Sequence, residues 1–356
     1  MKTLAELGWS PWFSDRVASS DLAVLKLGRV TEHQKGLWQL TTPDTVLQAE
    51  VSGRFGYISL APEDYPAVGD YVLFRREQEG PAIIERVIDR RTCLWRKAAG
   101  RTSERQIIAA NMDEVWIVTS MNQELKLRRI ERYLTLVRSS GAAPVVLLTK
   151  ADICQDRSVV DRVRSVAGDA RVLVVSAISG EGLDAVRSLT APGKTIAIAG
   201  SSGVGKSTLI NRLSGQEQQA VLPTREADDK GRHTTTSRSL IFLPGGGMVI
   251  DTPGMRELGL SDAAPGMEEV FDEIEALAKQ CRYNNCSHSG EPECAVQEAI
   301  SQGQLETGRL ESLRKQQREL RYQEQKQSSR ARIDSKKRWK NINKEYRQLK
   351  KHRDKP

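Results

Sequence analysis

The chain has 356 residues, of which 28% are charged and 38% are hydrophobic. This length exceeds what one compact core normally accommodates, so about two or three domains are expected. The sequence contains no run of roughly 18 apolar residues, as a membrane-spanning helix requires, and its first residues lack the apolar region of a secretion signal. The composition therefore excludes membrane-spanning, collagen-like and fully disordered proteins, and we expect a cytoplasmic protein.

The positive charge of the chain is concentrated at its end. The formal net charge is +8, but residues 309–356 carry 18 basic and 6 acidic side chains, so the preceding chain is net negative. Within this tail, Trp339 lies between basic residues, a pattern typical of RNA binding, because cations contact phosphates while an aromatic ring stacks on a base. A solvated basic helix without a specific partner is the alternative.

Short alternating segments at residues 36–40, 45–51 and 70–74, separated by Gly, Pro and Asp, predict a small β-barrel. From residue 111, apolar strand-like runs alternate with helix-length segments, which predicts a parallel α/β sheet with helices on both faces. The predicted strands are 115–118, 145–148, 172–175, 195–199 and 248–250, followed by a helix at 267–280. The predicted domains are an extension (1–23), the barrel (24–100), the α/β domain (101–260), a metal-binding domain (261–304) and a basic helical tail (305–356).

A phosphate-binding loop follows the predicted strand 195–199. Residues 200–208 match the P-loop pattern G-x-x-x-x-G-K-[ST], in which backbone N–H groups and a helix N-terminus surround phosphate oxygens. Lys206 is expected to reach the β and γ phosphates, and Ser207 to bind Mg²⁺. A glycine-rich turn that merely starts a helix is the weaker alternative. The residues assigned to phosphate binding are Gly200, Ser201, Ser202, Gly203, Val204, Gly205, Lys206, Ser207 and Thr208.

The segment after the P-loop predicts the switches of a GTPase. Asp251 follows an apolar strand and Gly254 comes three residues later, so we expect Asp251 to hold Mg²⁺ through water and the Gly254 N–H to sense a γ phosphate. Between the P-loop and Asp251, Thr234 or Thr235 is expected to bind Mg²⁺ and the γ phosphate. Their spacing does not separate these two candidates.

Residues Thr149, Lys150, Ala151 and Asp152 follow another predicted strand and resemble a guanine-binding [N/T]-K-x-D motif. The Asp152 carboxylate can accept hydrogen bonds from guanine N1–H and the N2 amino group, which adenine cannot donate, and Lys150 would pack over the base plane. The usual first residue is Asn. Because Thr149 lacks an amide, we expect a modest affinity for guanine.

Ser176 and Ala177 follow the next predicted strand and resemble the last guanine-contacting loop of GTPases. The motifs therefore run in the order guanine loop, Ser-Ala, P-loop, switch and D-x-x-G, whereas ordinary GTPases begin with the P-loop. All of these loops belong to the carboxyl edge of one sheet, so a circularly permuted connectivity still assembles one site.

Met255 stands directly after Gly254, where many GTPases have a glutamine that orients water. A thioether cannot orient or deprotonate the nucleophile, so intrinsic hydrolysis is expected to be slow. His233 is the nearest candidate for positioning the water, although it serves equally well as a structural residue of the switch or as a partner contact.

The spacing Cys281-x4-Cys286-x-His288-x5-Cys294 supplies three thiolates and one imidazole, which suits tetrahedral Zn²⁺. Four protein ligands leave no position for a catalytic water, so the predicted zinc is structural. Unrelated reduced cysteines, or a redox role for one of them, are the alternatives.

With the permuted motifs, the barrel and this cluster together, the chain resembles the bacterial small-ribosomal-subunit biogenesis GTPases of the RsgA family over roughly residues 22–305. The resemblance implies an OB-fold barrel, a permuted GTPase domain and a zinc domain. It also implies GTP hydrolysis with Mg²⁺, stimulated by the 30S subunit during late maturation, with 16S rRNA as a partner and GDP as a product. We expect a monomer without a membrane partner.

Two other functions remain open at this point. An ATPase would also have the P-loop and Asp251, but Asp152 argues against it. A nucleotide-gated rRNA-binding protein with little hydrolysis of its own is suggested by Met255.

Overall fold

The computed structural model describes residues 2–34, 36–59, 61–77, 80–97, 105–122, 125–215, 238–251 and 263–325. The chain divides into two compact units, the first comprising residues 1–259 and 265–276 and the second residues 260–264 and 277–356. No helix within these described ranges is both long and apolar enough to cross a membrane.

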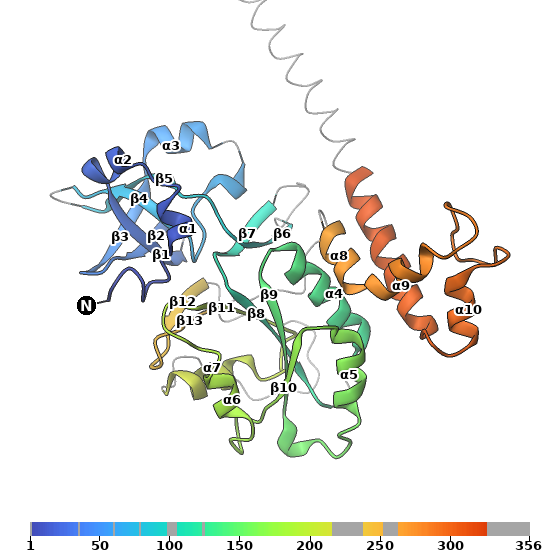
Figure 1. Cartoon of the computed structure of the whole chain (residues 1–356). Coiled ribbons are helices and arrows are strands. Elements are labelled where there is room, and N and C mark those ends of the chain that lie inside the picture. Colours follow the sequence, from blue (N-terminus) through green and yellow to red (C-terminus); the bar gives the residue numbers. More distant parts are fainter. Residues whose placement is uncertain are drawn as a thin grey trace, which may run out of the picture. The chain divides into compact units, whose positions relative to one another are not determined.

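The first unit begins with a closed barrel of five strands (Figure 1). β1 pairs with both β2 and β4, so the order β1-β2-β3-β5-β4 closes on itself, as in an OB-fold. Val30, Leu40, Val72, Phe74 and Ile84 are buried in its core. The predicted barrel is therefore confirmed. Its elements are β1 (Lys26–Gln34), β2 (Leu37–Thr41), β3 (Val46–Val51), α3 (Gly53–Ile58), η1 (Pro62–Asp64), β4 (Tyr71–Arg75) and β5 (Ala82–Val87).

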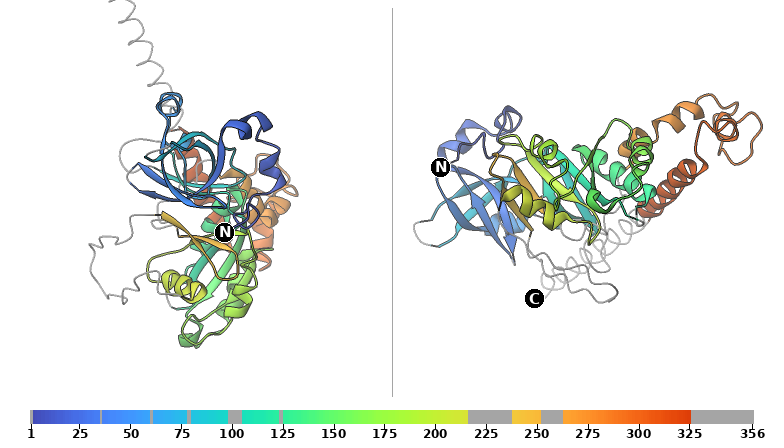
Figure 2. Two further views of the ribbon diagram at one scale, coloured as in Figure 1. Left: turned by 90° about the vertical axis from the view of Figure 1, so that its left-hand side faces the viewer. Right: turned by 90° about the horizontal axis from the view of Figure 1, so that it is seen from below.

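The N-terminal residues pack on the outside of this barrel. They form two short helices, α1 (Pro11–Ser14) and α2 (Ser19–Val24), which lie beside the barrel strands in the views of Figure 1 and Figure 2. Phe13 is buried with its ring 4.5 Å from that of Tyr71, and Leu73 and Ile88 complete the same apolar cluster. The extension thus adds a second core to the barrel.

Six further strands of the first unit form a mainly parallel sheet, which confirms the predicted α/β fold. Its order is β10-β9-β8-β11-β13-β12, and only β12 runs antiparallel to its neighbour β13. The strands are β8 (Glu114–Ser120), β9 (Ala143–Thr149), β10 (Arg171–Val174), β11 (Thr195–Ala199), β12 (Arg238–Phe242) and β13 (Met248–Asp251). The central strand β11 is buried along its whole length, as expected for a sheet covered on both faces.

Helices pack on both faces of this sheet. On one face, α6 (Leu183–Arg187) and α7 (Lys206–Ser214) bury Val186, Leu209 and Ile210 against alternate residues of β8 and β11. On the other face, α4 (Leu127–Ser139) contacts β8, β9 and α5 (Val159–Ala167). The helix predicted at 267–280 is wrong as one element. It is two helices, α8 (Ala264–Val270) and α9 (Asp272–Ala278), because the chain turns at Phe271 and buries that ring completely.

The barrel and the α/β sheet are continuous. β1 pairs with β12, with Glu32 opposite Ser239 and His33 opposite Arg238. A separate two-stranded ribbon, β6 (Cys93–Lys97) and β7 (Arg105–Ala110), lies in the sequence between the barrel strands and β8. At their junction the guanidinium of Arg29 is fully buried and donates to Leu7 O at 2.5 Å and to Thr195 Oγ1 at 2.9 Å. Burial lowers the pKa of Arg29 from its ordinary value.

The second unit contains the Cys/His cluster and two helical segments. α10 (Ala295–Ser301) begins directly after Cys294, and a longer helix covers residues 307–325. The tail beyond residue 325, including Trp339, lies outside the described residues.

Candidate functional site

The P-loop connects β11 to α7 and has the backbone needed to surround phosphates. Gly200, Gly203 and Gly205 have positive φ angles of 152°, 78° and 96°. A Cβ atom at Gly200 would lie 2.3 Å from Val118 O, so this position requires glycine. α7 begins at Lys206, and the Lys206 Nζ donates to Gly200 O at 2.9 Å and to Ser201 O at 2.6 Å. The lysine ammonium therefore lies at the loop, together with the N-terminus of α7, where a polyphosphate would bind.

Asp251 lies at the carboxyl end of β13, beside the P-loop strand. It is opposite Ile198 of β11 in the sheet register and only 8% exposed. This register brings an acidic side chain to the same sheet edge as Ser207, which is the first-turn residue of α7. The other predicted switch residues, His233, Thr234, Thr235 and Gly254, lie outside the described residues.

Thr149 joins the predicted guanine loop to the P-loop. Its Oγ1 hydroxyl donates to Val204 O at 2.6 Å and lies 3.2 Å from Thr119 O. The next residue, Lys150, has a φ of 60°, and Ala151 and Asp152 follow in a 3₁₀ turn, η2 (Ala151–Ile153). The hydroxyl of Thr149 thus makes a bond between the two loops without an amide group.

Asp152 and Ser176 lie in contact, as expected for two parts of one base-binding site. The Ser176 hydroxyl is 2.5 Å from Asp152 Oδ1, and it accepts hydrogen bonds from the N–H groups of Ile178 and Ser179. Ser176 itself is fully buried. The loop that carries Ala177 therefore fixes one oxygen of the Asp152 carboxylate and leaves the other available to a base.

One further residue of this region, Arg129, belongs to no sequence motif and was not predicted. Arg129 lies in the first turn of α4, and its Nη1 donates to Ser201 Oγ at 2.9 Å. The signal that identifies it is topological. α4 follows β8, β8 is a neighbour of β11, and the carboxyl ends of parallel neighbours lie at one edge.

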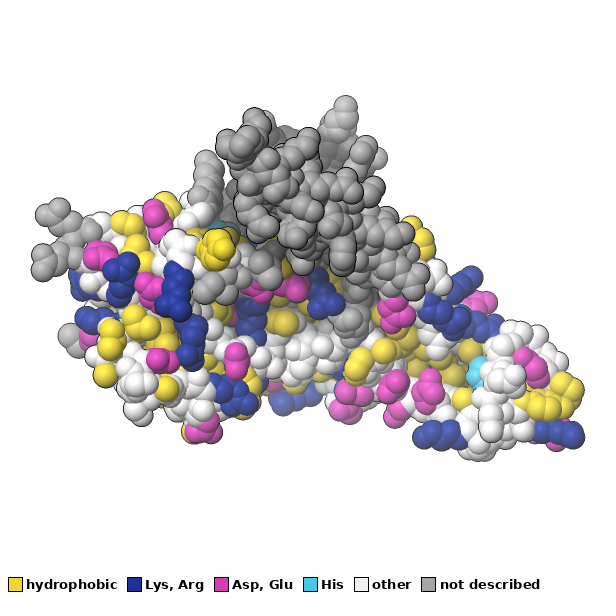
Figure 3. Space-filling view, turned by 90° about the horizontal axis from the view of Figure 1, so that it is seen from above, with side chains coloured by type: hydrophobic (Ala, Val, Ile, Leu, Met, Phe, Trp, Pro, Cys, Tyr) yellow, Lys and Arg dark blue, Asp and Glu magenta, His cyan; other side chains and the backbone are white. Residues whose placement is uncertain are grey.

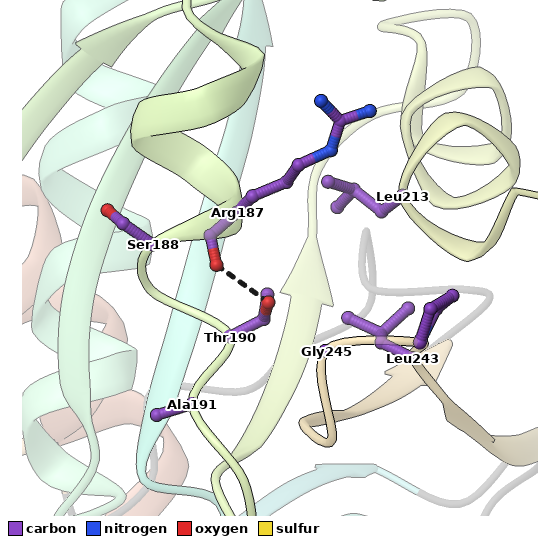
Figure 4. A pocket seen from close by; sticks show the side chains of 8 residues that line it. Arg187, Ser188, Thr190, Ala191, Leu213, Leu243 and Gly245 are labelled. Atoms are coloured by element: carbon purple, nitrogen blue, oxygen red, sulfur yellow. Dashed lines mark hydrogen bonds between the residues drawn. The ribbon is translucent and has the colours of Figure 1, made fainter.

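A cavity of about 270 Å³ lies at the opposite edge of the sheet (Figure 4). It is lined by residues of α6, the end of α7 and the β12–β13 turn, including Arg187, Leu213 and Leu243, and Thr190 Oγ1 donates to Arg187 O within it. Thr190 precedes the start of β11, whereas the P-loop follows its end. This cavity is therefore separate from the nucleotide site.

Cys281, Cys286, His288 and Cys294 come together in the second unit, with their ligand atoms within 4.8 Å of one another. The Cys281 Sγ is 3.9 Å from the Cys294 Sγ, and the His288 Nδ1 is 3.6 and 3.5 Å from these two sulfurs. Tetrahedral zinc with Zn–S bonds of about 2.3 Å and Zn–N bonds of about 2.0 Å separates its ligands by roughly 3.5 to 3.8 Å. The four residues can hold a metal ion, and the three distances among Cys281, His288 and Cys294 are close to those of a tetrahedral zinc site.

The fold and this site define a circularly permuted P-loop GTPase. Residues 87–261 match the family model described as RsgA GTPase. The chain is 44% identical over 301 residues to "Small ribosomal subunit biogenesis GTPase RsgA" of Methanosarcina acetivorans, an alignment that covers 84% of this chain and 80% of that protein. It is 41% identical over 321 residues to "Small ribosomal subunit biogenesis GTPase RsgA 2" of Vibrio vulnificus, covering 90% and 88%.

Solved structures show the same architecture. "Crystal structure of YjeQ from Thermotoga maritima" matches with a TM-score of 0.62 at 26% identity, covering 83% of this chain and 99% of that one. "The crystal structure of YloQ, a circularly permuted GTPase" matches with a TM-score of 0.58 at 23% identity, covering 83% and 95%, and supports the fold. The chain belongs to the RsgA family, and it is a GTP-hydrolysing enzyme.

Proposed function

We propose that this GTPase acts in the biogenesis of the small ribosomal subunit. It would bind the 30S subunit and its 16S rRNA as a monomer in the cytoplasm, hydrolyse GTP when the subunit completes its active site, and leave with GDP at a late stage of maturation. The catalytic part of this proposal is supported by hydrogen bonds that hold the guanine loop beside two other loops. Thr149 bonds to Val204 of the P-loop, and Ser176 of the Ser-Ala loop bonds to Asp152. The names of the relatives support the ribosomal part.

In this proposal, Asp152 selects guanine and Lys206 with the P-loop amides binds the phosphates. Ser207, Asp251 and either Thr234 or Thr235 would hold Mg²⁺, which supplies positive charge at the β and γ phosphates when it is bound. The reaction is attack of water on the γ phosphorus with GDP as the leaving group. Preorganised donors stabilise the charge that develops on the transferred group.

His233 is our candidate for positioning the attacking water, because Met255 has no group that can do so. Replacing His233 with Ala should lower kcat while leaving the affinity for GTP near that of the wild type. A parallel loss of GTP affinity would instead indicate that His233 only shapes the switch.

The guanine assignment is tested by Asp152→Asn. An Asn amide at this position donates where the carboxylate accepts, so it suits xanthine, whose carbonyl replaces the guanine amino group. We expect this variant to lose GTP affinity and to gain xanthosine triphosphate affinity, while ATP competes with neither. An unchanged preference for GTP would contradict the role of Asp152.

A basic groove in the second unit supports contact with rRNA. A cavity of about 590 Å³ is lined by the cations Arg314, Lys315, Arg318 and Arg321 of the helix at 307–325, with one carboxylate, Glu311. Arg314 Nη2 donates to Ser287 O at 2.9 Å and to Ser289 Oγ at 3.1 Å, so this helix is tied to the loop that carries His288. Cations spaced along a helix beside a fixed loop suit a phosphate backbone.

The barrel offers a different surface. On the face drawn in Figure 3, its Lys and Arg side chains are interspersed with Asp and Glu and do not form one continuous basic patch. We assign phosphate contacts to the groove of the second unit, because its cations gather on one helix.

The salt dependence of binding to purified small subunits tests this assignment. Arg318→Ala with Arg321→Ala should reduce the slope of log affinity against log salt by roughly one to two, since each lost phosphate contact releases fewer counterions. Lys279→Ala, an exposed cation of the same unit outside the groove, is the matched control. Equal slopes for the double variant and the wild type would place the RNA contact elsewhere.

Zinc is our choice for the metal of the second unit, because three thiolates and one imidazole suit it. All four ligands would come from the protein, so we assign this zinc a structural role. Metal analysis of the purified protein should find about one zinc per chain.

A nucleotide-gated rRNA-binding protein with little hydrolysis remains the second candidate, and Met255 favours it. Phosphate release measured with and without small subunits separates the two. Stimulation by subunits supports the enzyme, and tight GTP-dependent binding without stimulation supports the gated binder.

A further inference from the structure

The first turn of α4 places a cation beside the phosphate-binding loop. Arg129 Nη1 donates to Ser201 Oγ at 2.9 Å, while Ser201 O accepts from Lys206 Nζ at 2.6 Å. Because one serine joins the two cations, the guanidinium of Arg129 lies within about 10 Å of the Lys206 ammonium, given standard covalent dimensions. Ser201 is buried, whereas Arg129 is exposed and can change rotamer.

The chemistry of this contact points beyond the serine. A guanidinium has five N–H donors in a planar fork that matches phosphate oxygens, and its bonds to charged oxygens are roughly twice as strong as bonds between neutral groups. A neutral hydroxyl uses one of these donors. The neighbouring Arg128, in contrast, is paired with the buried carboxylate of Glu131, so its charge is already neutralised locally.

The geometry points to Arg129 as a catalytic arginine that binds the γ phosphate of GTP. It leaves Ser201 when GTP is bound and donates to γ-phosphate oxygens, whose charge changes as the water oxygen bonds to phosphorus and the bond to the bridging oxygen breaks. It transfers no proton. Position 255 is a methionine rather than a water-orienting glutamine, which lowers the hydrolysis rate. An arginine from the same chain offsets part of this loss, because charge stabilisation and water positioning contribute separately to the rate.

This inference rests on nucleotide binding by the P-loop. It is tested with the full-length protein by comparing its affinity for GDP with its affinity for a GTP analogue. Affinities for GDP and for a non-hydrolysable GTP analogue would be measured in the wild type, Arg129→Ala and Arg129→Lys. Arg164→Ala is the matched control, since Arg164 is an exposed arginine on α5 that pairs with Asp161 of its own helix.

We expect Arg129→Ala to lose roughly tenfold in affinity for the analogue with GDP affinity unchanged, and to slow single-turnover hydrolysis by roughly 10- to 100-fold. Arg129→Lys should recover part of both. Arg164→Ala should match the wild type, because Arg164 pairs with Asp161 of its own helix.

Two results would overturn the inference. In the first, Arg129→Ala changes GDP and analogue binding equally, so that the arginine merely holds the loop. In the second, it behaves like Arg164→Ala. If the wild type itself binds neither nucleotide, nucleotide binding by this P-loop is refuted together with the role of Arg129, which distinguishes the two failures.

Discussion

The nucleotide site and the metal site of this protein are built in opposite ways. The nucleotide site collects side chains from Arg129 to Asp251, and bonds between loops, such as Thr149 to Val204, hold its parts together. The metal site takes its four ligands from fourteen consecutive residues, 281–294, in which the described backbone forms no helix or strand. Two of those residues, His288 and Glu293, have positive φ angles of 60° and 55°.

This difference shows what fixes each geometry. Strands and helices position the nucleotide loops, so that site is organised by the fold. The Cys/His segment has few backbone bonds of its own and two residues in a region that costs non-glycine residues energy. Its shape should therefore depend on the bound metal.

Metal removal gives the largest expected effect. Chelation, or Cys294→Ser, should unfold segment 281–294 because metal binding contributes about 10 kcal/mol or more to such sites. Hydrogen exchange of the second unit should rise, with nucleotide affinity of the first unit retained. Cys154→Ser, outside the cluster, is the control. Loss of nucleotide binding in Cys294→Ser, measured with Mg²⁺ present, would show that the two sites are not independently organised.

Replacement of Arg29 tests the fold that organises the nucleotide site. Arg29→Met removes the buried donor to Thr195 Oγ1 and one of the two donors to Leu7 O, which keeps the Tyr71 hydroxyl, so we expect a loss of about 2 to 3 kcal/mol in the free energy of unfolding. Arg75→Met, which removes the ion pairs of this exposed arginine with Glu77 and Glu85 in the same barrel, should cost less than about 1 kcal/mol. Urea unfolding measures the free energy of unfolding of both variants. Equal losses in the two would contradict a stabilising role of Arg29 at the junction.

Gly266→Ala tests the packing of α8 on α4, the helix that carries Arg129. A Cβ atom there would lie 2.2 Å from Thr135 O and 2.4 Å from Ser139 Oγ, so the helices must separate at a cost of about 1 to 3 kcal/mol. Gly53→Ala, where nothing lies within 4 Å, is the matched control. Thermal unfolding measures both variants, and equal melting temperatures would contradict this close approach.

Thr149→Val is expected to have the smallest effect. It keeps the shape of the side chain but removes the donor to Val204 O, so GTP affinity should fall about tenfold, equivalent to about 1.4 kcal/mol. Thr190→Val, which removes a similar hydroxyl at the far edge of the sheet, should leave affinity unchanged. Unaltered GTP binding in Thr149→Val would mean that the sheet alone aligns the two loops.

The same contrast explains how much could be predicted from the sequence. The Cys/His cluster is local, so the spacing of Cys281 to Cys294 was enough to predict that its ligand atoms meet. The barrel, the parallel sheet and the strand β11 also followed from alternation and apolar runs.

Contacts between distant segments were not predictable in this way. Arg129 carries no motif, and its bond to Ser201 depends on β8 lying beside β11. The break between α8 and α9 depends on burial of Phe271, which helical periodicity does not reveal. The strand pairing of His33 with Arg238 likewise joins residues far apart in the chain.

The central claim is that the small ribosomal subunit activates hydrolysis at this P-loop. The most direct measurement is phosphate release from GTP by the full-length protein with and without purified small subunits, in the wild type and in Lys206→Ala. The account predicts strong stimulation in the wild type and its loss in the variant, which removes the cation at Gly200 O and Ser201 O. Release that small subunits do not accelerate, from a protein that binds GTP tightly, would contradict it.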